Sequence, residues 1–215
     1  MSEGETGAGL RLNALLGAAG MDTLDAAQMG RFEEYLALLI RWNERVNLTS
    51  VRDEEGILSR HFVESIVCAR ALPQGITTLL DFGSGGGFPG IPIALCRPEI
   101  EVTVAESQGK KAAFLQEAVR VLGISVKVHA GRAELLKVQY KCITLRAVDK
   151  MDEAVEAAAR LVAPGGWLAL MTTQGDLVRL QRRAGAGFSW ESPIPLPGGD
   201  ERLLAFGRLK VSSPV

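Results

Sequence analysis

Long hydrophobic runs are missing from this chain of 215 residues. No stretch approaches the ~20 consecutive apolar residues that a membrane-spanning helix needs. The opening MSEGETGAGLRLN also lacks the basic segment and following apolar segment of a secretory signal peptide. We therefore expect a cytoplasmic protein that does not partner with a membrane.

Cysteine is scarce, and the cysteines that are present do not form a metal-binding pattern. Cys68, Cys96 and Cys142 each lie within an apolar segment, with no CxxC pair and no Cys/His cluster. Metal sites and disulfide frameworks both depend on such spacings. We expect reduced cysteines in the core and no bound metal.

A strong excess of either charge is also absent. The formal net charge is -1, with -4 on residues 1–75 and +3 on residues 76–215. A dedicated nucleic-acid-binding domain usually carries a larger basic excess, so this distribution permits an RNA partner without requiring one. With 47% hydrophobic residues and 9 prolines, the composition is that of a globular protein. The length suits one domain with an appendage.

The appendage corresponds to residues 1–75, which we expect to form an N-terminal helical extension. Its start, Ser2 to Gly9, is small and polar and is expected to be disordered. Apolar residues then recur at three- and four-residue steps from Phe32 to Val46, which predicts an amphipathic helix. A second stripe from Leu58 to Ala69 predicts another helix, which ends before a proline.

Residues 76–215 alternate short apolar runs with helical stretches, which is typical of βαβ units. Strands are expected near 77–81, 101–106, 125–129, 142–146, 167–172, 188–190 and 203–206, and helices near 89–96, 110–122, 151–162 and 176–184. No helical pattern follows Lys210, so the last two strands should pair as an antiparallel hairpin at the sheet edge. The expected fold class is α/β, with a Rossmann-like, seven-stranded and mostly parallel sheet.

A glycine-rich run, DFGSGGGFPG from Asp81 to Gly90, lies between a predicted strand and a predicted helix. Such a turn sits at the carboxyl edge of a parallel sheet, where open α/β folds bind ligands. Gly83 and Gly85 allow a ligand to approach the backbone closely. A carboxylate at Asp81 could hold a ligand ammonium, directly or through water. A cationic ligand favours S-adenosylmethionine over a dinucleotide pyrophosphate.

Three further strand ends contribute candidate ligand contacts. Glu106 lies 23 residues beyond the first glycine, a separation typical of an acid that binds a ribose diol. Backbone groups at Ala133 and Glu134 follow the third strand and could contact an adenine edge. Arg146 ends an apolar strand, where a charge is costly without a partner. It is therefore a candidate functional residue, with a structural ion pair as the alternative.

Histidine offers a second catalytic candidate. His61 and Ser65 are four residues apart on the second predicted helix and should share a face. No obvious nucleophile or third ligand accompanies them, so a structural histidine is the alternative interpretation. Upstream, Asn47, Thr49 and Arg52 could contact a substrate, although turn formation also explains the first two.

These residues together resemble one bacterial family. The matching motifs are WN with NLTS at residues 42–50, RH to ES at 60–65, DFGSGGGFPGIP at 81–92, ES with K and FL at 106–115, RA at 146–147 and ER at 201–202. The chain is similar to the small-subunit ribosomal RNA methyltransferase G family, formerly called glucose-inhibited division protein B. The continuation of the glycine run into FPGIP, with WN and NLTS upstream, is more specific than the glycines alone.

The resemblance implies a class I S-adenosylmethionine-dependent methyltransferase with an N-terminal helical cap, acting on N7 of a guanine in 16S ribosomal RNA. Residues matching Gly83, Phe88, Arg146 and the Ala133 and Glu134 backbone would hold the cofactor, and Glu106 would hold its ribose.

Two departures from the family pattern stand out. Met171-Thr172 replaces a frequent Lys-Gly pair, which puts in doubt a phosphate contact from that strand. Glu64 stands where the family often has Asp, a chemically mild change.

The sequence also leaves three alternative hypotheses about function. They are a class I methyltransferase with another substrate, an RNA-binding ribosome-assembly factor without turnover, and, disfavoured by the FPG sequence, a nicotinamide-dependent oxidoreductase. The sequence leaves open which guanine is modified and whether the partner is naked 16S RNA or the small ribosomal subunit. It also leaves the oligomeric state open, a monomer included.

Overall fold

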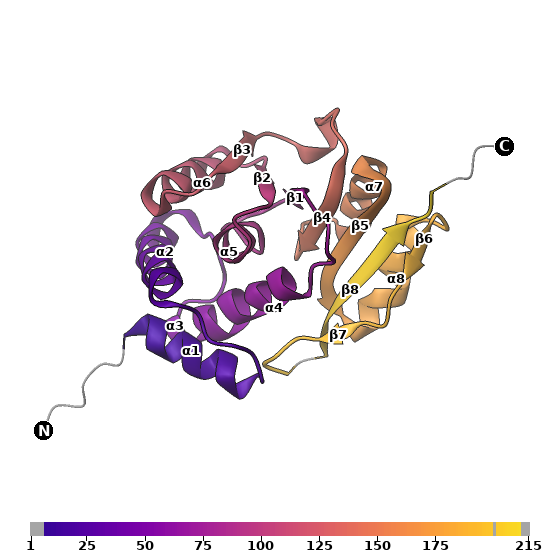
Figure 1. The fold of residues 1–215 in the computed structure, drawn as a ribbon. Coiled ribbons are helices and arrows are strands. Elements are labelled where there is room, and N and C mark those ends of the chain that lie inside the picture. The colour runs from indigo at the N-terminus through magenta and orange to yellow at the C-terminus, as the bar shows by residue number, and fades with distance from the viewer. Residues whose placement is uncertain (1–6, 200, 212–215) are drawn as a thin grey trace, which may run out of the picture.

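A single twisted sheet organises the molecule (Figure 1). The computed structural model describes residues 7–199 and 201–211. The strands are β1 (Thr78–Phe82), β2 (Glu101–Glu106), β3 (Val126–Ala130), β4 (Tyr140–Arg146), β5 (Val162–Thr173), β6 (Phe188–Trp190), β7 (Ile194–Pro195) and β8 (Arg202–Leu209). Their order is β3-β2-β1-β4-β5-β8-β6, with β7 paired to β8. The first five strands are parallel, and β8 is antiparallel to its neighbours.

The sheet has eight described strands, one more than the sequence predicted. The additional strand, β7, spans only Ile194–Pro195. Two residues cannot display the alternation that marks a strand in sequence. The predicted final hairpin is confirmed, because β6 pairs antiparallel with β8 at the end of the sheet.

Strand order reverses beside β1, and this fixes where a ligand can bind. The chain runs from β1 outward to β2 and β3, then returns to place β4 on the other side of β1. At this switch point the loops that follow β1 and β4 diverge, which opens a crevice at the carboxyl ends of the strands. The glycine-rich run follows β1 directly.

The helices agree with most of the sequence predictions. They are α1 (Ala8–Ala18), α2 (Ala26–Val46), α3 (Glu54–Gly56), α4 (Glu64–Ala71), α5 (Gly90–Cys96), α6 (Gly109–Leu122), α7 (Met151–Leu161) and α8 (Gln174–Ala184). Asp25 caps α2 through a capping box with Gln28, and Asn47 ends it in a left-handed conformation. Among the described residues, no helix is both long and apolar enough to cross a bilayer.

Helix α1 was not predicted, and the expected disorder at Ala8 and Gly9 is wrong. Gly9 is buried, and its amide donates a hydrogen bond of 2.8 Å to Glu33 Oε1. Leu12 and Leu16 are fully buried against the neighbouring helices. Tertiary packing thus stabilises a segment of 11 residues, which is too short to form a stable helix on its own. The expectation for residues 1–6 lies outside the described residues.

The second predicted helix contains an irregular turn. Between α3 and α4, residues Ile57–Val63 form a π-helix, so the three pieces run continuously from Glu54 to Ala71. A π-turn adds a residue to the helical repeat and re-aims the side chains on it. His61 lies within this turn.

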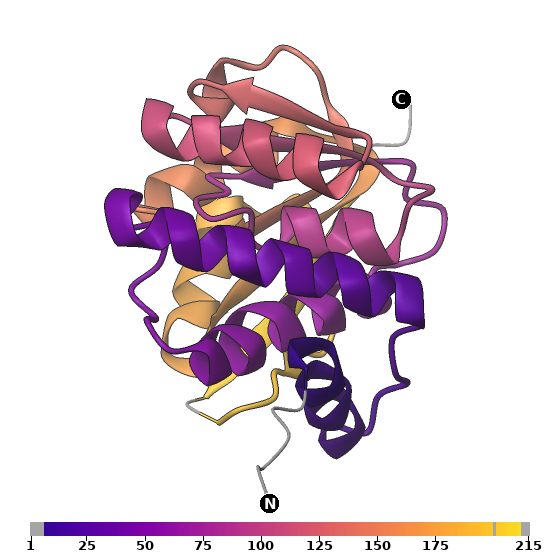
Figure 2. The same cartoon turned by 90° about the vertical axis from the view of Figure 1, so that its left-hand side faces the viewer.

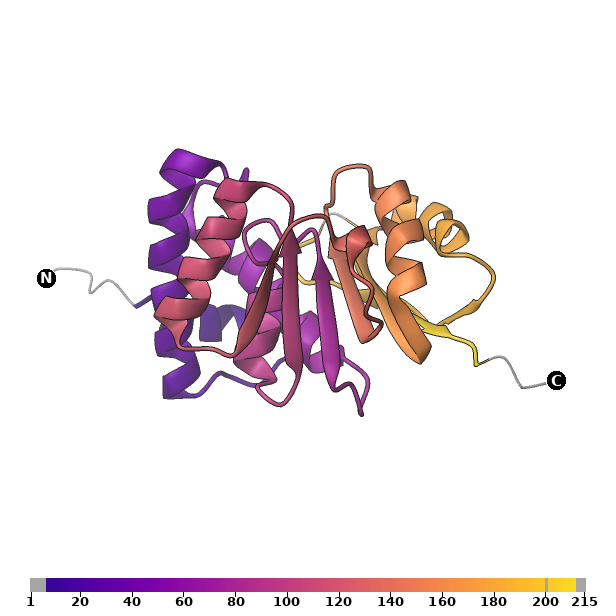
Figure 3. The same ribbon diagram turned by 90° about the horizontal axis from the view of Figure 1, so that it is seen from above.

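The helices cover both faces of the sheet. Viewed from above, α2 and α6 lie on one side of the strands, and α7 and α8 lie on the other (Figure 3). Helix α2 packs against α1, α5 and α6, and it crosses the face shown in Figure 2. Leu12, Leu39 and Phe62 belong to the same core as Leu79 of β1 and Val104 of β2. The N-terminal helices therefore share a core with the sheet. The predicted boundary at residue 75, between a helical extension and a methyltransferase domain, stays a prediction.

Candidate active site

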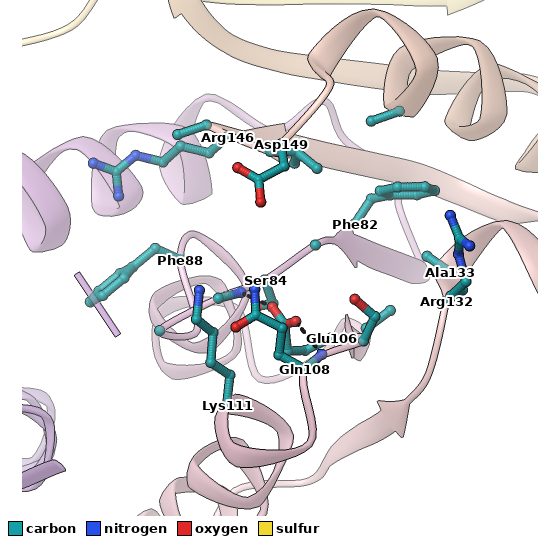
Figure 4. A pocket seen from close by; sticks show the side chains of 18 of the residues that line it. Phe82, Ser84, Phe88, Glu106, Gln108, Lys111, Arg132, Ala133, Arg146 and Asp149 are labelled. Atoms are coloured by element: carbon teal, nitrogen blue, oxygen red, sulfur yellow. Dashed lines mark hydrogen bonds between the residues drawn. The ribbon is translucent and has the colours of Figure 1, made fainter. Parts of the chain in front are cut away.

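A cavity of about 500 Å³ opens at the carboxyl ends of β1 to β4 (Figure 4). It is lined by the candidate His61 and by most of the residues predicted to bind the cofactor: Gly83, Gly85, Phe88, Glu106, Ala133, Glu134 and Arg146. In Figure 4 Arg146 and Phe88 lie at one end, Ala133 and Arg132 at the other, and Glu106 between them. The cavity therefore suits an elongated ligand.

The glycine-rich loop presents its backbone to this cavity at Gly85. Gly85 has a φ of 56°, and a methyl group added there would meet no heavy atom within 4 Å. Gly87 differs, because an added methyl group would collide with the Tyr35 hydroxyl and with Ile91. Gly83, with a φ of 70°, would bring a methyl group 3.0 Å from Val148. Only Gly85 of these three opens onto free space.

Asp81 does not reach the cavity, contrary to the sequence-based expectation of a ligand contact. Its side chain is 1% exposed and accepts hydrogen bonds from Thr144 Oγ1 at 2.9 Å, the Gly90 amide at 3.0 Å and the Ser84 hydroxyl. Burial raises the pKa of the Asp81 carboxyl, and these hydrogen bonds oppose that shift. Asp81 thus stabilises the glycine-rich loop through hydrogen bonds near its start, at Ser84, and at its end, at Gly90.

Glu106 occupies the centre of the cavity wall. Its side chain accepts the Gln108 amide at 2.7 Å through Oε1 and the Gly85 amide at 3.0 Å through Oε2. A carboxylate has about four lone-pair sites, so two backbone bonds leave acceptors for two hydroxyl groups. The backbone bonds hold the carboxylate in place before any ligand arrives. This arrangement is suited to binding a diol.

The loop after β3 forms the far end of the cavity. A short 3₁₀ turn, Ala133–Leu135, follows Arg132. Ala133 is buried, whereas Glu134 forms an exposed ion pair of 2.7 Å with Arg132 Nε. The backbone of this turn lines the cavity, as predicted for a contact with a flat heterocycle.

Arg146 lies where the first cavity adjoins a second one of about 350 Å³. Its Nη2 lies 2.7 Å from the Arg60 carbonyl oxygen, 2.8 Å from His61 Nδ1 and 3.2 Å from Glu64 Oε2. Burial lowers the pKa of the guanidinium, and Glu64 is the main opposing influence. The residue thus has both an ion pair and a position in the cavity, so the two sequence-based alternatives for Arg146 do not exclude each other.

His61 is held by contacts on both ring nitrogens and on its face. Nε2 lies 2.6 Å from Thr49 Oγ1, and the ring stacks on Phe88 with a centroid separation of 4.8 Å. Arginine can only donate, so Nδ1 accepts from Arg146 and Nε2 carries the proton. Burial, together with the charges of Arg146, Arg60 and Arg202, lowers the pKa of His61 to about 3.

Sequence reasoning assigned no role to Glu64 and Arg202, which complete this cluster. Glu64 is 1% exposed and pairs with Arg202 Nη2 at 2.8 Å as well as with Arg146. The available signal was an acid in the mostly apolar run from Phe62 to Ala69, where a buried charge needs a cationic partner. Arg52 instead donates to Asn47 Oδ1 at 2.8 Å within the preceding turn.

The second cavity is lined by residues of β4, β5, β8, α8, the helical segment from Arg60 to Glu64 and the segment around Leu196. Met171 and Thr172 form part of its wall. With these residues in place of a lysine and a glycine, β5 contributes no cationic side chain at that point. Arg179 and Arg202 are the cations supplied from α8 and β8. Among the described residues, no cluster of three or more side chains is arranged to hold a metal ion.

The sheet order and the position of the cavity define the class I methyltransferase fold. Solved methyltransferases share it at low sequence identity. One from Pyrococcus furiosus aligns with a TM-score of 0.62 and 14% identity, covering 87% of this chain and all of the other. A putative O-methyltransferase from Klebsiella pneumoniae gives 0.59 and 17%, covering 94% and 97%.

Sequence comparison narrows the class to one family. The family model described as rRNA small subunit methyltransferase G matches residues 28–184. A ribosomal RNA small subunit methyltransferase G from Neisseria meningitidis is 41% identical over 79% of this chain and 84% of its own length. Another from Roseiflexus is 38% identical over 84% and 83%. This chain belongs to the rRNA small subunit methyltransferase G family, which confirms the resemblance seen in its sequence.

Proposed function

We propose that this protein transfers a methyl group from S-adenosylmethionine to N7 of a guanine in 16S ribosomal RNA. The observation that carries the proposal is the elongated cavity at the switch point, with Glu106 at its centre and Arg146 at the border of a second cavity. Family membership supports the RNA substrate. The names of the relatives specify the small ribosomal subunit.

The residues of the first cavity fit the proposed cofactor in order along its length. The Glu106 carboxylate has acceptors left for the ribose hydroxyls, and the Ala133–Leu135 turn suits the adenine. The open face of Gly85 and the end near Phe88 and Arg146 would take the amino-acid part. When bound, S-adenosylmethionine supplies an electrophilic methyl group on a sulfonium.

The chemistry requires alignment rather than proton transfer. Guanine N7 carries an in-plane lone pair and loses no proton when it is methylated, so no general base is needed. His61 fits this requirement, because its Nδ1 is already occupied by Arg146 and its pKa is about 3. The chain's own contribution is to orient both reactants at the border between the cavities.

The second cavity supports the acceptor side of the proposal. Its apolar residues Met151 and Met171 can contact the face of a base, and Arg146 and Arg202 can contact an oxygen or a phosphate. Arg146 on N7 itself would block the reaction, so we expect it on O6, on phosphate or on the cofactor carboxylate. A cytoplasmic location follows from the proposed substrate.

A direct experiment tests both the reaction and its position. The protein is incubated with methyl-labelled S-adenosylmethionine and either 30S subunits or naked 16S RNA that lack the modification, and the RNA is digested to nucleosides. We expect the label in 7-methylguanosine. Label in any other nucleoside would refute the N7 assignment. Binding of the RNA and cofactor without transfer would instead favour an assembly factor.

A further inference from the structure

The side chain of Arg146 is anchored on one nitrogen only. All three of its described polar contacts, to the Arg60 carbonyl, His61 Nδ1 and Glu64 Oε2, are made by Nη2. Among the described residues, Nη1 and Nε make no hydrogen bond, and the guanidinium carbon lies 5.8 Å from the Phe88 ring centre. The guanidinium is therefore held through one nitrogen, and the residue lines both cavities.

His61 supplies the one uncharged side-chain acceptor among these contacts. A guanidinium N–H can bond to Nδ1 only when that nitrogen is unprotonated. With Nδ1 occupied in this way, Nε2 carries the proton and donates to Thr49 Oγ1 at 2.6 Å, a hydroxyl that also accepts the Val51 amide. Thr49 is itself placed by the Asn43 side chain, which accepts the Thr49 amide at 3.0 Å. A chain of contacts therefore runs from the loop after α2 to Arg146.

We propose that His61 is a positioning residue for methyl transfer, which as the neutral Nε2–H tautomer orients Arg146 at the border between the two cavities. It accepts no proton from the substrate. The inference rests on the proposed function, and it adds a role for a residue that touches neither reacting atom. The charged groups around the ring are Arg60, Arg146, Arg202 and, through Arg146, Glu64.

Two substitutions of His61 separate positioning from the alternatives. His61→Phe keeps a ring to stack on Phe88 and removes the acceptor, whereas His61→Asn keeps an acceptor close to the place of Nδ1 and removes the ring. Positioning predicts that single-turnover transfer to 30S subunits falls about tenfold in His61→Phe, the loss expected for one hydrogen bond to a charged group. His61→Asn should recover to within about threefold of the wild type.

The opposite patterns would overturn the proposal. A wild-type rate in His61→Phe would mean that only stacking matters. Equal, deep losses in both variants would mean that the imidazole has chemistry that an amide cannot replace. Ser59→Ala, on the same π-turn, serves as the matched control, since Ser59 bonds only to backbone oxygens of its own helix.

A double-mutant cycle tests whether His61 acts through Arg146. If it does, adding His61→Phe to Arg146→Ala should change the transfer rate by less than about twofold, because the residue it positions is already gone. Full additivity of the two losses would reject the proposal. Thermal unfolding of each variant reports on folding, and Thr49→Val, which removes the partner of Nε2, should give an intermediate loss if the ring variants unfold.

A measurement without turnover distinguishes failure of this inference from failure of the proposed function. The chain has 2 histidines, so nitrogen NMR of the imidazoles, assigned with His129→Asn, reports on His61 directly. We expect Nε2 protonated and Nδ1 unprotonated from about pH 5.5 to 8.5, given an ordinary pKa of ~6.5. Titration of His61 within this interval would overturn the tautomer assignment whether or not the protein methylates RNA.

Discussion

Replacing Glu106 by Gln should weaken cofactor binding and lower folding stability by a similar amount, while the protein still folds. The side chain keeps its size but loses its charge and one acceptor oxygen. In the wild type both oxygens accept backbone amides, from Gln108 at 2.7 Å and Gly85 at 3.0 Å. The new NH₂ group can only donate, so where it faces one of these backbone amides that hydrogen bond is lost, and where it faces the ribose it cannot accept from a hydroxyl.

The magnitude follows from the number of hydrogen bonds at risk. Two ribose hydroxyls bonded to a carboxylate contribute about 1.5–3 kcal/mol each. Glutamine can still accept from one of them, so we expect a loss of about 1.5–3 kcal/mol, or a Kd raised about 10- to 150-fold. The amide left without its partner should cost about 1–3 kcal/mol of folding stability.

Calorimetric titration with S-adenosylmethionine and with S-adenosylhomocysteine measures the first effect, and thermal unfolding measures the second. Glu101→Gln is the matched control, because Glu101 begins the same strand, is exposed and pairs only with Lys127 at 3.4 Å. An unchanged Kd in a folded Glu106→Gln protein would refute the assignment of the ribose site. The same rise in Glu101→Gln would show that the effect is not local.

Three further predictions concern the loop, the arginine and pH. Gly85→Ala, at an open position with a φ of 56°, should weaken cofactor binding at a stability cost of about 1–2 kcal/mol. Gly87→Ala should cost clearly more stability, because its methyl group meets Tyr35 and Ile91. Calorimetry and unfolding midpoints that do not separate the two variants would contradict this prediction. Arg146→Ala should lower the rate of methyl transfer at least about 100-fold. It should also lower the unfolding midpoint, since buried Glu64 loses one of its two arginine partners. A wild-type rate of transfer in this variant would show that Arg146 is not part of the active site. Transfer should vary little between about pH 6.5 and 8.5. The folded-state pKa of about 3 for His61 lies below the unfolded value of ~6.5. The stability that His61 contributes should therefore be fully present above pH 6.5 and should fall on acidification, by up to about 2–3 kcal/mol at pH 4.5. Urea unfolding of His61→Asn should show a smaller fall, and a fall identical to that of the wild type would contradict this prediction.

The depressed pKa also changes what a pH profile can decide. With an ordinary histidine pKa, a general base at His61 would make the rate climb through about pH 6.5. With a pKa of about 3, the ring stays neutral over the whole interval in either mechanism. A flat profile therefore excludes other titrating bases but not His61, and only the Asn and Phe variants resolve its role.

The sequence by itself determined the features that depend on short-range patterns. The strand before Gly83, the glycine-rich turn and the helix after it are specified by apolar runs and turn residues within about twenty positions. The spacing from Gly83 to Glu106 predicted that the acid lies at the end of the neighbouring strand, because a helical crossover between parallel strands has a limited range of lengths. Those local rules were sufficient to bring most of the residues predicted to bind the cofactor to one cavity, and their role in binding stays a prediction.

Only the tertiary structure decided which polar groups face the cavity and which are bound by protein. Asp81 and Glu106 are both buried acids at strand ends, yet Asp81 is hydrogen-bonded to Thr144 and Ser84 away from the cavity, whereas Glu106 lines it. The glycines look alike in sequence but differ in what stands beside them. Arg146 and His61 lie 85 residues apart in the chain. Such contacts depend on which elements pack together, and burial and charge at those contacts set the protonation of each group.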